Sequence, residues 1–208
     1  MEICIAFSDL FNPETLIRYG GVTLLIIIIF AETGLFFGFF LPGDSLLFIA
    51  GMLTSSKFLD MNIFLLWLLL LIAAVTGSWV GYLFGRRAAG YFANRKENFF
   101  YKKKYIDTTR SFYKRYGWGA FVLGRFLPIV RTFVPIFAGM AGIEHGKFIL
   151  FNVIGAAAWI STMLFAGFGL GNLFPNLSEH LELIVASMII ITAIPVIITW
   201  NKQQKSTD

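Results

Sequence analysis

The sequence predicts an all-α integral membrane protein, and three observations support this class. Hydrophobic residues make up 57% of the 208 residues, charged residues make up 14%, and the mean hydropathy is +0.74. So few charges cannot give a water-soluble globule its polar surface. The apolar residues also fall in long runs, near the roughly 20 residues that a helix needs to cross a bilayer.

These runs organise residues 1–208 as a single membrane domain. Three of them are predicted to be transmembrane helices: 61–85, 147–171 and 183–200. Two further runs, 21–53 and 119–142, carry charges and prolines in their middle and cannot be read as simple crossings. We expect 1–20 to be an amphipathic N-terminal segment, without a cleaved signal peptide because no basic region and cleavage site precede the first run.

Residues 86–118 form a basic segment between apolar runs. Ten Lys or Arg residues lie between Arg86 and Arg115, against the two acids Glu97 and Asp107. The positive-inside rule places such a segment in the cytoplasm. Interleaved aromatic residues favour short amphipathic helices on anionic lipid over a nucleic-acid surface. We therefore expect membrane lipids, and no nucleic acid, as partners of this segment.

With the basic segment placed in the cytoplasm, the charges of the later loops indicate whether residues 119–142 cross the membrane or enter it and return. A single crossing would place the acidic loop 172–182 in the cytoplasm and the lysine-containing tail outside, which reverses the positive-inside rule. A segment that enters and returns makes every loop agree with the rule and puts the C-terminus in the cytoplasm. We therefore predict a re-entrant hairpin over 119–142.

Four residues mark the expected tips of two such hairpins: Pro42, Gly43, Pro128 and Pro135. Proline removes a helical hydrogen bond and disfavours the helical conformation of the residue before it. The dipeptide Pro-Gly is a strong indicator of a turn. Residues 21–53 are accordingly predicted to be the first re-entrant hairpin, with the side of the N-terminus left open. Two opposed hairpins, each followed by a crossing helix, would form an inverted repeat with irregular backbone near the membrane midplane.

Each predicted hairpin carries two charges, and the signs are opposite. Glu32 and Asp44 lie in the first hairpin, whereas Arg125 and Arg131 lie in the second. An ionised side chain at the bilayer centre costs about 2.5 kcal/mol or more, so such residues usually mark a site or pathway. The signs predict that the two hairpins meet. A turn at Pro128 could aim both guanidinium groups at one point, and paired arginines suit a phosphate.

The roles of these charges remain open at this stage. The arginines could bind a substrate phosphate, or they could lock the fold by pairing with the acids. Glu32 and Asp44 could be those partners or could carry protons, and Asp44 after Pro-Gly could also cap a helix. Trp79, Trp159 and Asn152 are candidates for orienting the hairpins, although a tryptophan in mid-span more often packs. Glycines at four-residue spacing predict close helix contacts.

The sequence offers little that an enzyme would need. Cys4 is its one cysteine, and no group of His, Asp or Glu has metal-ligand spacing. It also lacks Gly-x-Ser-x-Gly, a glycine-rich phosphate loop and a nucleophile beside a base. We therefore predict no metal, no cofactor and no catalytic activity.

The residues around the charged turns resemble the DedA family, which is related to the SNARE-associated or VTT-domain proteins. The matching pieces, spread over roughly residues 20–171, include Glu32-Thr33-Gly34 and Leu41-Pro42-Gly43-Asp44. The string G-R-F-x-P-x-x-R-T-x-x-P-x-x-A-G, from Gly124 to Gly139, is the most specific. The chain departs from the pattern at Gly77-Ser78, where many members have Gly-Asp, so a role for that acid is in doubt.

The resemblance implies a protein of the bacterial inner membrane that translocates lipid. Family members recycle undecaprenyl phosphate or move phospholipid, and coupling to the proton motive force has been proposed. Carried over to this chain, Arg125 and Arg131 would bind the lipid phosphate, and Glu32 and Asp44 would serve proton coupling or gating. Three residues of the matching pieces are expected to support the site: Gly124, Thr132 and Asn152.

Other functions are compatible with the same residues. The protein could be a proton-coupled cation or drug antiporter, a translocase for a phospholipid such as phosphatidylethanolamine, or a scaffold that transports nothing. The lipid head group, the direction of transport, the coupling ion and the oligomeric state, including a homo-oligomer, are left open.

Overall fold

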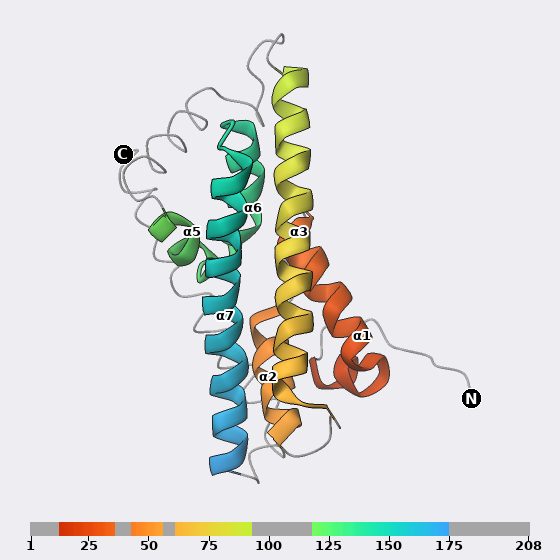
Figure 1. Ribbon diagram of the computed structural model, residues 1–208. Coiled ribbons are helices and arrows are strands. Elements are labelled where there is room, and N and C mark those ends of the chain that lie inside the picture. Colours follow the sequence, from red (N-terminus) through yellow and green to blue (C-terminus); the bar gives the residue numbers. More distant parts are fainter. Residues whose placement is uncertain (1–12, 36–42, 56–60, 93–117, 175–208) are drawn as a thin grey trace, which may run out of the picture.

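The computed structural model describes residues 13–35, 43–55, 61–92 and 118–174, and the regular elements in these ranges are helices (Figure 1). They are α1 (Pro13–Gly34), α2 (Gly43–Ser55), α3 (Ile63–Phe92), α5 (Trp118–Arg125), α6 (Pro128–Met140) and α7 (His145–Leu173). The prediction of an all-helical chain is confirmed for these ranges. The predicted helix at 183–200 lies outside the described residues.

Two of these helices, α3 and α7, have the length and apolar composition to cross a membrane. Their apolar parts, Ile63–Ala89 and His145–Leu173, have mean hydropathies of 2.4 and 1.9. These helices confirm the apolar runs expected at 61–85 and 147–171. Helix α3 itself continues past the expected span, to Phe92. Charge marks where a segment leaves the membrane, but the residues that follow, Arg86 to Ala89, are good helix formers and do not end the helix.

The N-terminal helix α1 contains a sharp bend. Gly21 has a φ of 57°, a left-handed conformation that glycine adopts at low cost. Residues 13–20 therefore form a helical piece set at an angle to the rest of α1. The expected amphipathic segment 1–20 is described only in this part, since residues 1–12 lie outside the described ranges.

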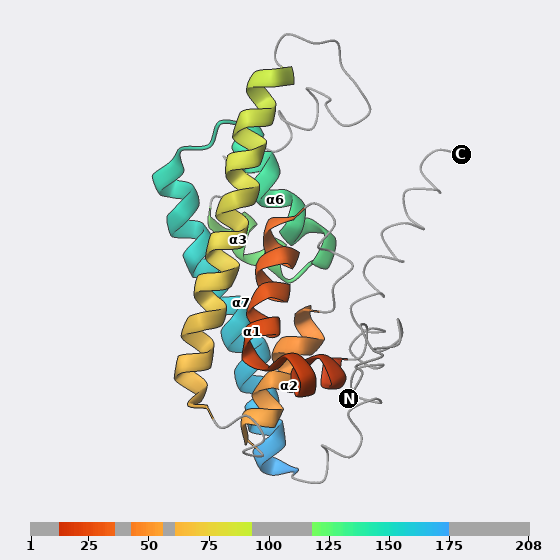
Figure 2. The same ribbon diagram turned by 90° about the vertical axis from the view of Figure 1, so that its right-hand side faces the viewer.

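The two long helices run antiparallel and contact each other, and the shorter helices pack along them (Figures 1 and 2). α2 packs chiefly on α7, whereas α6 packs chiefly on α3. The pair α1–α2 precedes α3 in the chain, and the pair α5–α6 precedes α7. Each of α2 and α6 thus packs on the long helix that follows the other pair. The end of α1, the start of α2, the end of α5 and the start of α6 all lie near mid-height of α3 and α7.

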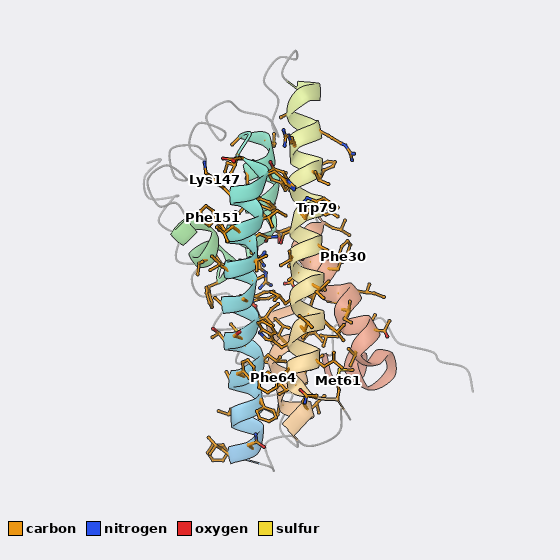
Figure 3. All side chains as sticks on the ribbon, in the orientation of Figure 1. Phe30, Met61, Phe64, Trp79, Lys147 and Phe151 are labelled. Atoms are coloured by element: carbon orange, nitrogen blue, oxygen red, sulfur yellow. The ribbon has the colours of Figure 1, made fainter. Side chains whose placement is uncertain are left out.

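Apolar side chains fill the space between the helices and also stand on their outer faces (Figure 3). The main core joins α1, α2, α3 and α7, and a smaller core around Tyr82 and Phe148 joins α3, α6 and α7. On the outside, Phe64, Phe84 and Leu173 are 61% to 72% exposed. Apolar surface on this scale is unfavourable in water and suits contact with lipid.

Glycines bring the crossing helices into backbone contact. A Cβ atom on Gly51 of α2 would meet the carbonyl oxygen of Leu164 in α7, and one on Gly167 of α7 would meet that of Phe48 in α2. In the other pair, a Cβ on Gly85 of α3 would meet the carbonyl oxygen of Ile136 in α6. The predicted close packing through small residues is confirmed at these crossings.

The α2–α7 crossing gives a direct test on one helix. Gly167→Ala should lower the melting temperature of the purified protein in detergent, because overpacking costs about 1–3 kcal/mol and each kcal/mol is about 2–4 °C for a chain of this size. Gly169→Ala is the matched control, since no atom lies within 4 Å of its Cβ position. Alanine there should leave the melting temperature unchanged or raise it. Equal melting temperatures for the two variants would contradict this contact.

Candidate functional site

The four charged residues predicted from the sequence meet where the helix ends come together. Glu32 lies in the last turn of α1, Asp44 in the first turn of α2, Arg125 at the end of α5 and Arg131 in the first turn of α6. They are between 0% and 9% exposed, so all four are enclosed by protein. The expectation that the two halves of the chain meet at these charges is confirmed.

Arg131 takes both acids as partners. Its Nη1 lies 2.6 Å from Asp44 Oδ1, and its Nη2 pairs with Glu32 Oε1. The Trp159 ring covers the guanidinium, with its centroid 4.7 Å from Cζ, and Trp159 Nε1 donates a hydrogen bond of 2.7 Å to Asp44 Oδ1. Two carboxylates and an aromatic face therefore hold this cation, through charge-assisted hydrogen bonds and a cation–π contact.

Neighbouring residues position Glu32 for this pairing. A Cβ atom on Gly43 would collide with the Glu32 carboxylate, so glycine at the start of α2 leaves the space that this side chain occupies. The start of a helix also favours a negative charge. Thr132 Oγ1 donates to the Glu32 carbonyl oxygen at 3.3 Å and ties α6 to the end of α1. Gly43 and Thr132 thus place the acid at the junction of three helices.

Arg125 has a different set of partners. Its Nη2 donates to Ser78 Oγ at 2.9 Å and also to Asn152 Oδ1, and both acceptors are neutral. Within the described ranges, no carboxylate lies within ion-pair distance of Arg125, and its buried Nη1 has no hydrogen-bond partner there. Of the alternatives left open by the sequence, pairing of an arginine with the acids holds for Arg131 and, within the described ranges, not for Arg125.

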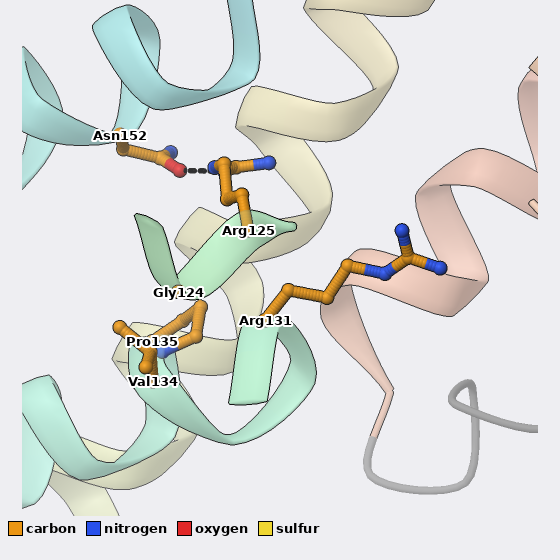
Figure 4. A pocket seen from close by; sticks show the side chains of 6 residues that line it. All are labelled: Gly124, Arg125, Arg131, Val134, Pro135 and Asn152. Carbon is orange, nitrogen blue, oxygen red and sulfur yellow. Dashed lines mark hydrogen bonds between the residues drawn. The ribbon is translucent and has the colours of Figure 1, made fainter. Parts of the chain in front are cut away.

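The break between α5 and α6 explains why the side chains of Arg125 and Arg131 point in different directions. Figure 4 shows Arg125 pointing toward Asn152 of α7, whereas Arg131 points toward α1. A turn at Pro128 could have aimed both guanidinium groups at one point. In the structure they point in different directions. Arg125 ends α5, where the helix dipole favours a cation, and Arg131 lies in the next helix after a change of direction.

Both arginines nevertheless line one small cavity (Figure 4). Its lining residues are Gly124, Arg125, Arg131, Val134, Pro135 and Asn152. Gly124 keeps α5 close to α6, because a Cβ atom there would lie 3.2 Å from Val130 Cγ1. Of the residues expected to support the site, Gly124 and Asn152 line the cavity and Thr132 lies beside Glu32.

The prolines expected at the hairpin tips have different positions. Pro128 is the first residue of α6, where a missing N–H breaks no helical hydrogen bond. Pro135 lies inside α6, so its expected place at a turn is wrong. The helix continues through it because only one hydrogen bond is lost and the ring is buried near Gly81 of α3. Pro42 lies outside the described residues.

Two site residues were underrated by sequence reasoning. Trp159 was expected mainly to pack, yet it contacts both Asp44 and Arg131. A buried indole N–H needs an acceptor, and in an apolar span this need is the signal that could have identified it. Ser78 was noted only as a departure from a family pattern, although a hydroxyl amid apolar residues also needs a partner. Trp79, by contrast, is 39% exposed and has the His145 ring as a neighbour.

The Asp44 carboxylate serves the charge cluster. Asp44 follows the first residue of α2, and its Oδ1 accepts from Arg131 and Trp159. Its side chain thus joins the start of α2 to α6 and α7.

The fold and the site together define a helical membrane protein with a buried cluster of mixed charge at the junction of its helices. The sequence pattern of the VTT domain matches residues 41–169. The chain is 37% identical to Protein DedA of Escherichia coli K12, over 97% of this chain and 93% of that protein. It therefore belongs to the DedA family of VTT-domain membrane proteins.

Other relatives are membrane proteins by name. An uncharacterized membrane protein of Mycobacterium tuberculosis H37Rv is 34% identical, over 93% of this chain and 87% of its own length. The Escherichia coli K12 inner membrane protein YqjA is 32% identical, over 79% of this chain and 73% of its own length. No solved structure matches the chain.

The partners of the two arginines lead to a prediction about stability. Arg131→Met should lower the free energy of unfolding by about 3–5 kcal/mol, because it leaves two buried carboxylates without their cation. Arg125→Met leaves only neutral acceptors unpaired and should cost about 1–3 kcal/mol. Melting temperatures of the two variants in detergent measure the difference.

A compensating variant separates lost charge from lost packing. Adding Glu32→Gln and Asp44→Asn to Arg131→Met removes the stranded charges and should recover part of the lost stability. A triple variant no more stable than Arg131→Met alone would contradict the importance of the ion pairs.

Proposed function

We propose that this protein translocates a lipid phosphate across the membrane, and that undecaprenyl phosphate, which the family resemblance implies, is the first candidate. The observation that carries the proposal is the buried Arg125 beside a cavity, held by neutral partners alone among the described residues. A buried cation requires a counter-charge. A phosphate group supplies one and accepts two hydrogen bonds from an arginine.

We infer further that α1–α2 and α5–α6 are the two re-entrant hairpins of an inverted repeat. Three features support this: the crossed packing of α2 on α7 and α6 on α3, the antiparallel long helices, and the helix ends at mid-height. In addition, Gly85 and Gly167 both stand 22 residues after the first residue of their helix and both contact a short helix. This architecture would place the charge cluster near the membrane midplane, where transporters of this kind bind their substrates. A cytoplasmic basic segment and C-terminus belong to the same proposal.

In this proposal Arg131 is a gate. Glu32 and Asp44 hold its guanidinium toward α1, away from the partners of Arg125. Protonation of the acids would weaken both ion pairs and free Arg131 to join Arg125 on the phosphate. Return of the acids to their charged form would recapture Arg131 and release the lipid. The membrane potential would act on the same charges, at about 2.3 kcal/mol per elementary charge per 100 mV.

A cation or drug antiporter has less support. Such a protein needs a carboxylate that is available to its cation, whereas Glu32 and Asp44 both pair with Arg131. A phospholipid phosphate would use the same chemistry as a polyprenyl phosphate, so it is a further candidate substrate. Movement of a lipid between leaflets breaks no covalent bond, so the proposal is for transport and requires no catalytic residue.

The proposal is tested with purified protein in vesicles. Labelled polyprenyl phosphate should change leaflet faster in vesicles with protein than in empty vesicles, whereas the corresponding polyprenol should not be accelerated. A labelled phosphatidylethanolamine, run in parallel, separates the two lipid classes.

Variants identify the residue responsible. Arg125→Met should reduce the transport rate at least tenfold, because the phosphate loses its buried cation, while Gly169→Ala should keep the wild-type rate. Wild-type protein that moves the polyprenyl phosphate no faster than empty vesicles would overturn the proposed function.

A further inference from the structure

One nitrogen of the Arg125 guanidinium is held by neutral groups of two helices. Its Nη2 donates to Ser78 Oγ of α3 at 2.9 Å and also to Asn152 Oδ1 of α7. Ser78 Oγ is itself fixed, because it donates to the Ala74 carbonyl oxygen at 2.9 Å. Asn152 Nδ2 donates to the Val75 carbonyl oxygen at 3.0 Å, which turns its Oδ1 toward the arginine. The guanidinium is therefore oriented by partners that carry no charge.

The two arginines have further donors that face no acceptor. Arg125 Nη1 is buried and has no hydrogen-bond partner within the described ranges, and the same is true of Arg131 Nε. The two residues are 5% and 4% exposed, and both line the cavity in Figure 4. A buried donor without an acceptor is costly, most of all on a charged group. These donors therefore point to a ligand in the cavity that accepts hydrogen bonds.

The size of the cavity limits what this ligand can be. The cavity has room for about one water-sized particle while Arg131 is held by the acids. A phosphate group, with its four oxygen atoms, is too large for this space. A water molecule would accept hydrogen bonds but would leave the buried cation without a counter-charge. A halide ion is a single atom, and it supplies both the acceptor and the charge.

The other charges of the junction determine when an anion is favoured there. Glu32 and Asp44 both pair with Arg131, and no carboxylate in the described part of the chain lies within ion-pair distance of Arg125. With all four groups ionised, the two acids balance the two arginines, and an added anion would leave one negative charge in excess. Loss of charge at either acid removes that excess. An anion at Arg125 is therefore favoured by the same protonation that the proposed gate requires.

We infer that the cavity beside Arg125 binds a chloride ion, which neutralises this arginine while no lipid phosphate is bound. The inference fits the sequence at Ser78, where many family members have an acid that could carry a counter-charge on the protein itself. It goes beyond the proposed function, because the contacts of the two arginines carry it. Only the exchange of ligands rests on the proposed function: release of Arg131 would make room for the phosphate group, and chloride would leave as it enters.

The first test is the melting temperature of the full chain, purified in detergent, as sodium gluconate is replaced by sodium chloride at constant ionic strength. Above its Kd, chloride should raise the melting temperature by about 3–5 °C for each tenfold increase in concentration, because it binds only the folded state. Bromide should act in the same way, whereas gluconate is too large for the cavity. Arg125→Met should remove the response. Arg87→Met, which removes an exposed arginine of α3, is the matched control and should keep it.

Variants that change one charge test whether chloride acts as the counter-ion of Arg125. Asn152→Asp changes no heavy-atom count, and Ser78→Asp restores the Gly-Asp of the family pattern; both place a carboxylate beside Arg125 Nη2. From the same titration, each should bind chloride at least about tenfold more weakly than the wild type. Ser78→Asn, with the shape of Asp and no charge, should bind it more tightly than Ser78→Asp. Glu32→Gln removes one negative charge and should bind chloride roughly fivefold or more tightly than the wild type.

Melting temperatures in gluconate show which variants are folded, and the carboxylate variants on α3 and α7 test the same point independently. A wild type that responds to neither halide, or an equal response in Arg125→Met, would overturn the inference. Equal responses of Ser78→Asp and Ser78→Asn would also overturn it, because charge would then not matter. A chloride response without lipid transport in vesicles would overturn the proposed function alone. Transport of polyprenyl phosphate without a chloride response would overturn the chloride site alone.

Discussion

The ion pairs of Arg131 with Glu32 and Asp44 are the interaction on which the rest of the structure depends. Buried charges are tolerated only when they are paired and hydrogen-bonded, so α1, α2 and α6 must bring their charged ends to one place. Trp159 adds α7 to this junction through Asp44 and the arginine face. The cluster therefore specifies which helix ends meet, in a protein whose apolar surfaces could pack in many ways.

The glycine contacts hold the helices at the separation that this cluster requires. Gly51 and Gly167 bring α2 against α7, and Gly85 brings α3 against α6, each through close approach to a backbone carbonyl. These crossings link each short helix to the long helix of the other pair. The helices are thus held together by close backbone contacts at the crossings, whereas side-chain ion pairs hold the junction.

In the proposed mechanism, one arginine has a structural role and the other binds the ligand. Arg131 is neutralised by the protein and completes the fold, whereas Arg125 is oriented by Ser78 and Asn152 and keeps its charge. A buried group that departs from the usual rule of charge pairing is expected at a functional site. The proposed transport cycle needs both kinds of arginine: one waits for an anion, and the other changes partner when the acids change charge.

The sequence by itself determined the membrane class, the long helices α3 and α7, and the meeting of acids with an arginine. These follow from local properties: the length of apolar runs and the cost of an unpaired charge. Only the tertiary structure decided that Arg131 takes both acids, that Arg125 pairs with Ser78 and Asn152, and that Pro135 lies within α6 although Pro128 begins it. The physical reason is that the sequence does not fix the direction in which each side chain points. The partner that a side chain reaches depends on how its helix packs against others distant in sequence, and residue types and spacing do not contain that packing.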